Sequence, residues 1–184
     1  MPRRCLVVLG VLVSLGARAA PVQTPAKNPP PPRVSELPES EQLRIDGSKN
    51  PELIPQWSAW GFMFRLIANG PGALPREVHL LVTKEQTALV LKEAQALQII
   101  DRACMQRAAR FNALLGTESP ASLDAKLRAL TVECRVATLK ARDRVLAALS
   151  PEAAAVLRQS VEETKATTST TIAKKDLARW LEPE

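Results

Sequence analysis

Two cysteines, Cys104 and Cys134, lie equally far from Ser119, in the middle of the turn-like segment G-T-E-S-P (116–120). On both sides of this turn, apolar residues recur at steps of three and four, which is the spacing of one face of an α-helix. Each cysteine belongs to the apolar face of its own segment. Because residues equidistant from the turn lie side by side in an antiparallel hairpin, the spacing predicts a helical hairpin in which the two cysteines face each other.

The ends of both segments carry helix start and stop signals. The sequence T-K-E-Q (83–86) has the pattern of a capping box, and Gly116 follows the last apolar position of the first segment. Ser119 followed by Pro120 is a typical start of the second helix. The two helices of the hairpin are therefore expected over residues 84–115 and 120–149.

Two more helices complete the predicted fold. Residues 53–68 form an aromatic helix, which contains four of the six aromatic side chains of the chain, and S-P-E opens a further helix over 151–166. The segment T-T-S-T-T (167–171) should weaken the end of this last helix, since β-branched and hydroxyl residues are poor helix formers. The predicted fold class is all-α, with the aromatic helix and the C-terminal helix packed on the long hairpin.

The first 19 residues have the organisation of a secretory signal peptide. Arg3 and Arg4 precede the apolar stretch 5–16, and Ala17-Arg18-Ala19 provides small residues for cleavage. The apolar stretch is shorter than the about 20 residues of a membrane-spanning helix, although an uncleaved anchor remains the alternative. We therefore expect an exported protein, either periplasmic or secreted.

The remaining chain divides by composition. Residues 20–49 include four consecutive prolines and predict a disordered, extended linker, with a docking motif for a proline-binding domain as the alternative. Residues 50–175 are expected to form the helical domain, and residues 176–184 a C-terminal tail. In an oxidising compartment the two cysteines left after cleavage would form a Cys104–Cys134 disulfide; two buried free thiols and a redox pair are the alternatives.

The chain lacks the usual components of an active site. It has a single histidine, His79, and no G-x-S-x-G, H-E-x-x-H or glycine-rich phosphate-binding motif. We therefore expect no metal site, no cofactor and no enzymatic activity, with an enzyme of unrecognised type as the remaining possibility. Removing the three arginines of the leader from the 25 basic residues leaves 22 against 19 acidic residues, a net charge of +3. Such a mild charge predicts no nucleic-acid partner.

Two groups of residues form the candidate binding surface. The aromatic helix contributes Trp57, Trp60, Phe62 and Phe64, and the second hairpin helix contributes Arg128, Arg135 and Arg142, spaced seven residues apart. The aromatic residues either supply bulk to the alanine-rich core or form an exposed surface for a membrane or a partner. The arginines either belong to an ordinary solvated helix face or form a strip that binds anionic lipid, envelope polysaccharide or an acidic partner.

The segments V-T-K-E-Q (82–86) and L-S-P-E-A (149–153) resemble the L-T-x-x-Q segments of the Spy and CpxP family of periplasmic chaperones. Val82 replaces the leucine in the first, and Ser150 and Ala153 replace threonine and glutamine in the second. The resemblance implies a small exported helical protein that shields unfolded proteins in a cradle. The predicted function is thus non-enzymatic binding of an unidentified protein partner, in a chaperone-like or protein-interaction role; the alternative is a binder of the membrane or envelope surface.

Overall fold

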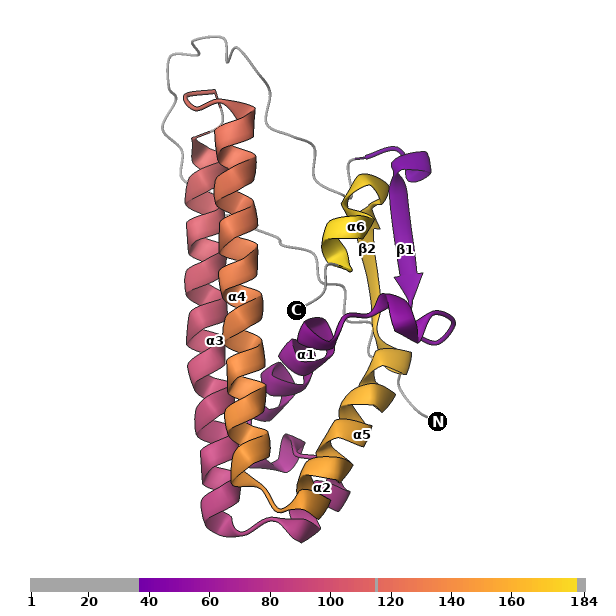
Figure 1. Cartoon of the computed structure of the whole chain (residues 1–184), viewed down its shortest axis with the longest axis vertical. Helices are drawn as coiled ribbons and strands as arrows, with labels where there is room; N and C mark the ends of the chain where they lie inside the picture. Colours follow the sequence, from indigo (N-terminus) through magenta and orange to yellow (C-terminus); the bar gives the residue numbers. More distant parts are fainter. Residues whose placement is uncertain (1–36, 115, 182–184) are drawn as a thin grey trace, which may run out of the picture.

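The structure of the protein, a computed structural model, describes residues 37–114 and 116–181. Helices α3 and α4 form one long column, and α1, α2 and α5 pack beside it, with β1, β2 and α6 beside the other half of the column (Figure 1). The all-α prediction is confirmed, with the addition of a small two-stranded sheet. In chain order the elements are β1 (Gln42–Asp46), α1 (Gln56–Ala68), α2 (Arg76–Leu81), α3 (Lys84–Ala113), α4 (Pro120–Ala148), α5 (Pro151–Thr167), β2 (Ser169–Ala173) and α6 (Leu177–Trp180).

The hairpin is built as the sequence predicts, with helix ends within two residues of the expected positions. Thr83 and Gln86 form a reciprocal capping box at the start of α3. The Gln86 side chain also donates a hydrogen bond of 2.9 Å to the carbonyl oxygen of Ala148, which ties the start of α3 to the end of α4. Ser119 and Ser150 cap α4 and α5 through their hydroxyl oxygens.

The aromatic helix α1 supplies the bulk of the core. Phe64 and Ile67 are completely or almost completely buried, and Trp60 is 2% exposed. Because the facing positions of the hairpin are mostly small or aliphatic, the large rings of α1 fill the space between α3, α4 and α5. The other members of this core include Ile45, Ile54, Val78, Val90, Ala94, Leu97, Ala141, Val145, Leu157 and Val161.

The sheet corrects two sequence-based predictions. Residues 42–46, placed in a disordered linker, form strand β1, and Ser169–Ala173 continues past α5 as strand β2 instead of a frayed helix end. The strands pair antiparallel, with Leu43 opposite Ile172 and Ile45 opposite Thr170. Ile45 is fully buried, so the sheet closes one end of the core. The expected signal peptide and the linker up to residue 36 lie outside the described residues.

Gly47 marks the point where the end of β1 passes the end of α5. Its N–H donates a hydrogen bond of 2.9 Å to the carbonyl oxygen of Thr168. A Cβ atom at this position would lie 1.8 Å from the backbone carbonyl oxygen of Lys165, a contact that no side-chain rotation can relieve. The chain can therefore approach this closely only with glycine at position 47.

We expect Gly47→Ala to lower the free energy of unfolding by about 1–3 kcal/mol, because the sheet must shift away from α5. Urea denaturation followed by circular dichroism measures this change. Gly72→Ala is the matched control, since a Cβ there meets nothing within 4 Å. Equal denaturation midpoints for the two variants would contradict the close approach at Gly47.

Candidate functional site

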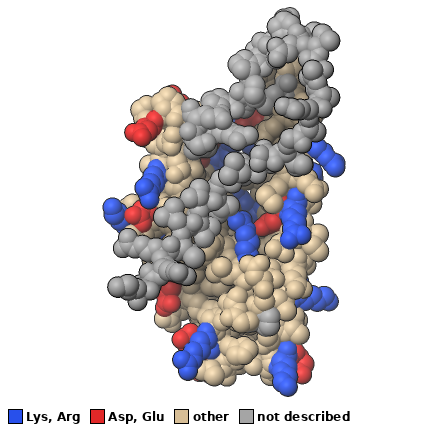
Figure 2. Space-filling view, turned by 180° about the vertical axis from the view of Figure 1, so that it is seen from behind, with Lys and Arg blue, Asp and Glu red and all other residues tan. Residues whose placement is uncertain are grey.

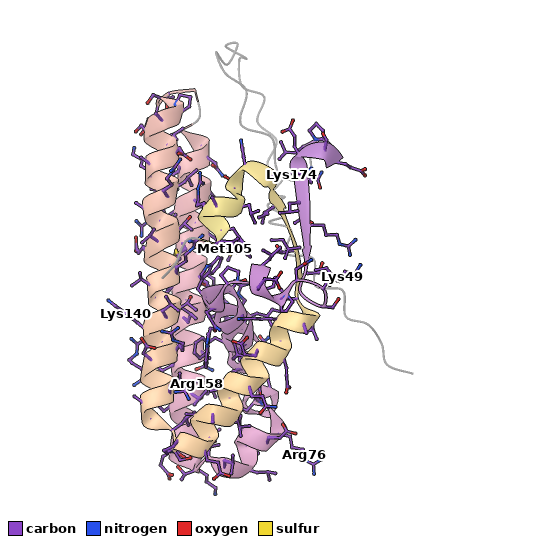
Figure 3. All side chains as sticks on the ribbon, turned by 45° about the vertical axis from the view of Figure 1, so that its right-hand side comes forward. Lys49, Arg76, Met105, Lys140, Arg158 and Lys174 are labelled. Carbon is purple, nitrogen blue, oxygen red and sulfur yellow. A yellow bond between two sulfur atoms is a disulfide. The ribbon has the colours of Figure 1, made fainter. Side chains whose placement is uncertain are left out.

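A cavity of about 260 Å³ opens between α1 and the two hairpin helices. Its lining is mainly apolar and includes Trp57 from α1, Met105 and Ala108 from α3, and Leu127 and Leu130 from α4. Figure 3 shows Met105 on the side of the column that faces α6, whereas Lys140 points away on the opposite side. The cavity therefore lies on the inner face of the hairpin.

The cavity exists because the apolar face of the hairpin is longer than the helix that covers it. Toward the base of the hairpin, Leu97 and Ala141 are buried beneath α1. Toward the turn, the apolar positions continue with Ala108 and Leu127, which are partly buried, and with Leu130 and Leu123, which are buried. Gly61 lies close to the Thr138 side chain, where α1 and α4 approach each other beside the cavity.

The disulfide forms part of the cavity wall. Cys104 and Cys134 are joined, with their Cα atoms 6.6 Å apart, within the range of about 4.4–6.8 Å typical of disulfides. The register inferred from the turn is therefore confirmed. Both cysteines are partly exposed and line the cavity, so the cross-link fixes the distance between α3 and α4 at this point.

The four aromatic residues of α1 do not form a common exposed surface. Trp60 and Phe64 are buried, with ring centroids 5.6 Å apart, so their assignment to a binding surface is wrong. Phe62 is partly buried and does not line the cavity. Of the four, Trp57 alone lines it. Phe64 is buried, Trp57 is partly buried and Arg65 faces water.

Trp57 lies at the centre of a cluster that joins α1, α4 and α6. The ring of Trp180 meets it edge to face at a centroid distance of 4.9 Å. The guanidinium of Arg135 lies 4.6 Å from the centroid of the Trp57 ring, a cation–π contact. Arg135 also donates a hydrogen bond of 2.9 Å to the carbonyl oxygen of Arg179. This cluster fixes the position of the Trp57 ring at the cavity wall.

The three arginines of the expected basic strip have different surroundings. Arg128 forms an ion pair with Asp124 at 2.7 Å, and Arg142 contacts Asp143 at 2.8 Å, whereas Arg135 stacks on Trp57. The hydrogen bond from Arg128, above all, holds the pKa of Asp124 below its ordinary value, so this carboxylate stays ionised at neutral pH.

Figure 2 shows basic and acidic side chains interspersed on the visible part of the surface. At the cavity, Arg65 pairs with Asp101 at 3.3 Å. The arginines therefore do not form the continuous cationic strip that their seven-residue spacing had indicated. Charges of both signs border an apolar hollow instead.

A second hollow, of about 360 Å³, lies between α1, α4 and α5 and is lined by more polar side chains, among them Arg142 and Arg158. No group of three His, Cys, Asp or Glu side chains that could hold a metal ion occurs in residues 37–114 and 116–181. The apolar cavity at the disulfide is thus the site that the geometry favours.

Four residues that belong to the site or support it were not predicted from the sequence as binding residues. They are Met105, Ala108, Leu127 and Trp180. Ala108 and Leu127 lie on the apolar faces of the two hairpin helices, and the spacing of these faces alone assigns them to the core. A signal was available: a 13-residue helix is about 20 Å long and cannot cover hairpin helices of about 45 Å. Comparing these lengths would have predicted that α1 does not reach the turn end of the hairpin.

No protein-family model matches this chain, and searches of curated proteins and of solved structures also find no match. The resemblance to the Spy and CpxP family therefore stays a prediction, which rests on the two short segments quoted above.

Proposed function

We propose that this protein is a non-enzymatic binding protein that takes up apolar side chains of a partner protein in the cavity between α1 and the hairpin. The observation that carries the proposal is the apolar face of the hairpin, which continues past α1 and ends in an open hollow. With about 260 Å³, the hollow is smaller than the about 300–1,000 Å³ of typical small-molecule sites. It suits one or two anchoring side chains of a protein segment.

A chaperone-like role follows from this type of contact. Apolar side chains are exposed mainly in unfolded or partly folded proteins, so a pocket for them selects such clients without reading a particular sequence. The signal-like N-terminus and the disulfide support a role outside the cytoplasm, where disulfides are stable. The L-T-x-x-Q resemblance points to the same kind of client.

The alternative, binding to a membrane or envelope surface, has less support. It relied on an exposed aromatic helix and a basic strip, but Trp60 and Phe64 are buried and Arg128 pairs with a carboxylate. We therefore favour the protein-binding role. As a separate finding, no helix in residues 37–114 and 116–181 combines the length and apolar character needed to cross a bilayer.

Filling the cavity should weaken client binding. We expect Ala108→Trp to raise the concentration needed for half-maximal protection of a client by about tenfold, the effect of losing one anchoring pocket. The assay follows light scattering of guanidinium-denatured malate dehydrogenase after dilution. Ala103→Trp is the matched control, because Ala103 is exposed on the same helix and does not line the cavity.

A second pair of variants keeps the test valid if the bulky substitution disturbs the fold. Met105 is 54% exposed and lines the cavity, whereas Ile99 on the same helix is 68% exposed and does not line it. Met105→Glu should weaken protection because a carboxylate at the mouth must be desolvated when an apolar side chain enters. Ile99→Glu should leave protection unchanged. Equal protection by all four variants and the wild type would refute the proposed site.

A further inference from the structure

Sulfur is concentrated in the wall of the apolar cavity. Residues 37–114 and 116–181 contain four sulfur-bearing side chains, and three of them, Cys104, Met105 and Cys134, line the cavity. The fourth, Met63, is buried in the core. Both hairpin helices therefore bring sulfur to this one site.

The sulfur-bearing side chains of the wall are accessible from solvent. Met105 is 54% exposed, on the side of the column that faces α6 (Figure 3), and both cysteines are partly exposed. The unbranched side chain of methionine has three rotatable bonds, so its thioether can adapt to the shape of a group that enters the cavity. The disulfide, by contrast, is held in place by α3 and α4. The cavity thus offers one adaptable and one fixed sulfur contact.

The polar groups of the wall are largely occupied within the protein. The hydroxyls of Thr131 and Thr138 donate hydrogen bonds of 2.8 and 3.1 Å to carbonyl oxygens of their own helix. A Cβ atom at Gly61 would meet the methyl carbon of Thr138 at 3.9 Å, so this methyl group is turned toward α1. Arg65 and Asp101 pair with each other. An uncharged side chain that needs few hydrogen bonds therefore suits the hollow.

We propose that the cavity is selective for aromatic side chains, so that its preferred clients are segments that expose phenylalanine or tryptophan. This inference rests on the proposed function and names the side chains that the site takes up. Polarisable sulfur makes favourable contacts with the edge of an aromatic ring, and an aliphatic side chain does not gain this interaction. A dry cavity of about 150 Å³ is enough to bind benzene. The cavity of about 260 Å³ therefore admits a phenyl or an indole ring.

The test compares two peptides that differ only in one ring. The first is the acetylated and amidated peptide glycine-serine-phenylalanine-serine-glycine, and the second has cyclohexylalanine in place of phenylalanine. On apolar area alone, the saturated ring would bind at least as tightly. We expect the phenylalanine peptide to have an about threefold to tenfold lower dissociation constant, the effect of one or two sulfur–aromatic contacts.

Binding is followed by NMR on the full-length chain with isotope-labelled methionine methyl groups. The ring current of a bound phenyl group should shift the methyl signal of Met105 as the peptide is added. The methyl signal of Met63 is the internal reference, since this side chain is buried and does not line the cavity.

Met105→Leu tests the contribution of sulfur directly. The variant keeps an apolar side chain of similar size and should fold, because Met105 is exposed. It should reduce the ratio of the two dissociation constants by about twofold or more, measured from the backbone amide signals of the residues that line the cavity. Met63→Leu is the matched control, because it removes a thioether from the core and should leave this ratio unchanged.

Each outcome separates the selectivity from the proposed function. Equal affinities for the two peptides would overturn the selectivity but leave the uptake of apolar side chains intact. An aromatic preference that Met105→Leu does not reduce would overturn the role of its sulfur. If neither peptide shifts the signals of the cavity wall, the cavity does not bind apolar side chains, and the proposed function fails together with this inference.

Discussion

Removing the Cys104–Cys134 disulfide is expected to lower the free energy of unfolding by about 3–4 kcal/mol. The cross-link closes a loop with a sequence separation of 30 residues, and the loss of loop-closure entropy in the unfolded chain sets this magnitude. For a domain of this size the melting temperature should fall by about 10 °C. Thermal unfolding with and without a reductant, followed by circular dichroism, measures the shift.

The Cys104→Ser/Cys134→Ser variant is the control for this experiment, since its melting temperature should be low and insensitive to reductant. Non-reducing mass spectrometry of the native protein should give a mass two hydrogens below that of the dithiol. Two thiols that alkylate in the native, air-exposed protein would contradict the cross-link.

Phe64→Ala is expected to cost about 3–5 kcal/mol of unfolding free energy. Its side chain is 1% exposed and lies at the centre of the core, so truncation removes apolar burial and leaves a cavity between closely packed helices. Because domains of this kind are stable by only about 5–15 kcal/mol, a large part of the stability should be lost. The change is measured as the shift of the urea midpoint.

Phe62→Ala provides the comparison within the same helix. Phe62 is partly buried and lies outside the core cluster, so the same chemical truncation should cost less. A loss at Phe62 as large as that at Phe64 would show that α1 packs with a different face inward. The pair thus tests the orientation of the aromatic helix, which the sequence alone left open.

The hairpin was predictable because independent local signals agreed. The helical spacing of apolar residues, the caps at Thr83 and Ser119, and the equal distances of the two cysteines from the turn all indicated one register. Each of these signals lies within or next to the element that it specifies. The disulfide adds a single non-local constraint, and the structure satisfies it.

The sheet was not predictable in the same way. Strand β1 has only five residues, and its only apolar residues are Leu43 and Ile45, with Arg44 between them. One repeat of the apolar–polar alternation is too short to distinguish a strand from a loop. The threonines of β2 are unfavourable in helices and favourable in strands, and only the pairing with β1 decides between the two. The cavity was missed for a related reason, because it depends on how far α1 reaches along the hairpin.

The pairing of β1 with β2 has a consequence for the order in which the protein folds. Gln42 pairs with Ala173, so the sheet joins segments from opposite ends of the described chain. Contacts of such long range form slowly, whereas the hairpin contacts are local and form early. A chain that is made from its N-terminus must hold β1 unpaired until β2 arrives. During this interval the protein itself exposes apolar segments of the kind that it is proposed to bind in others.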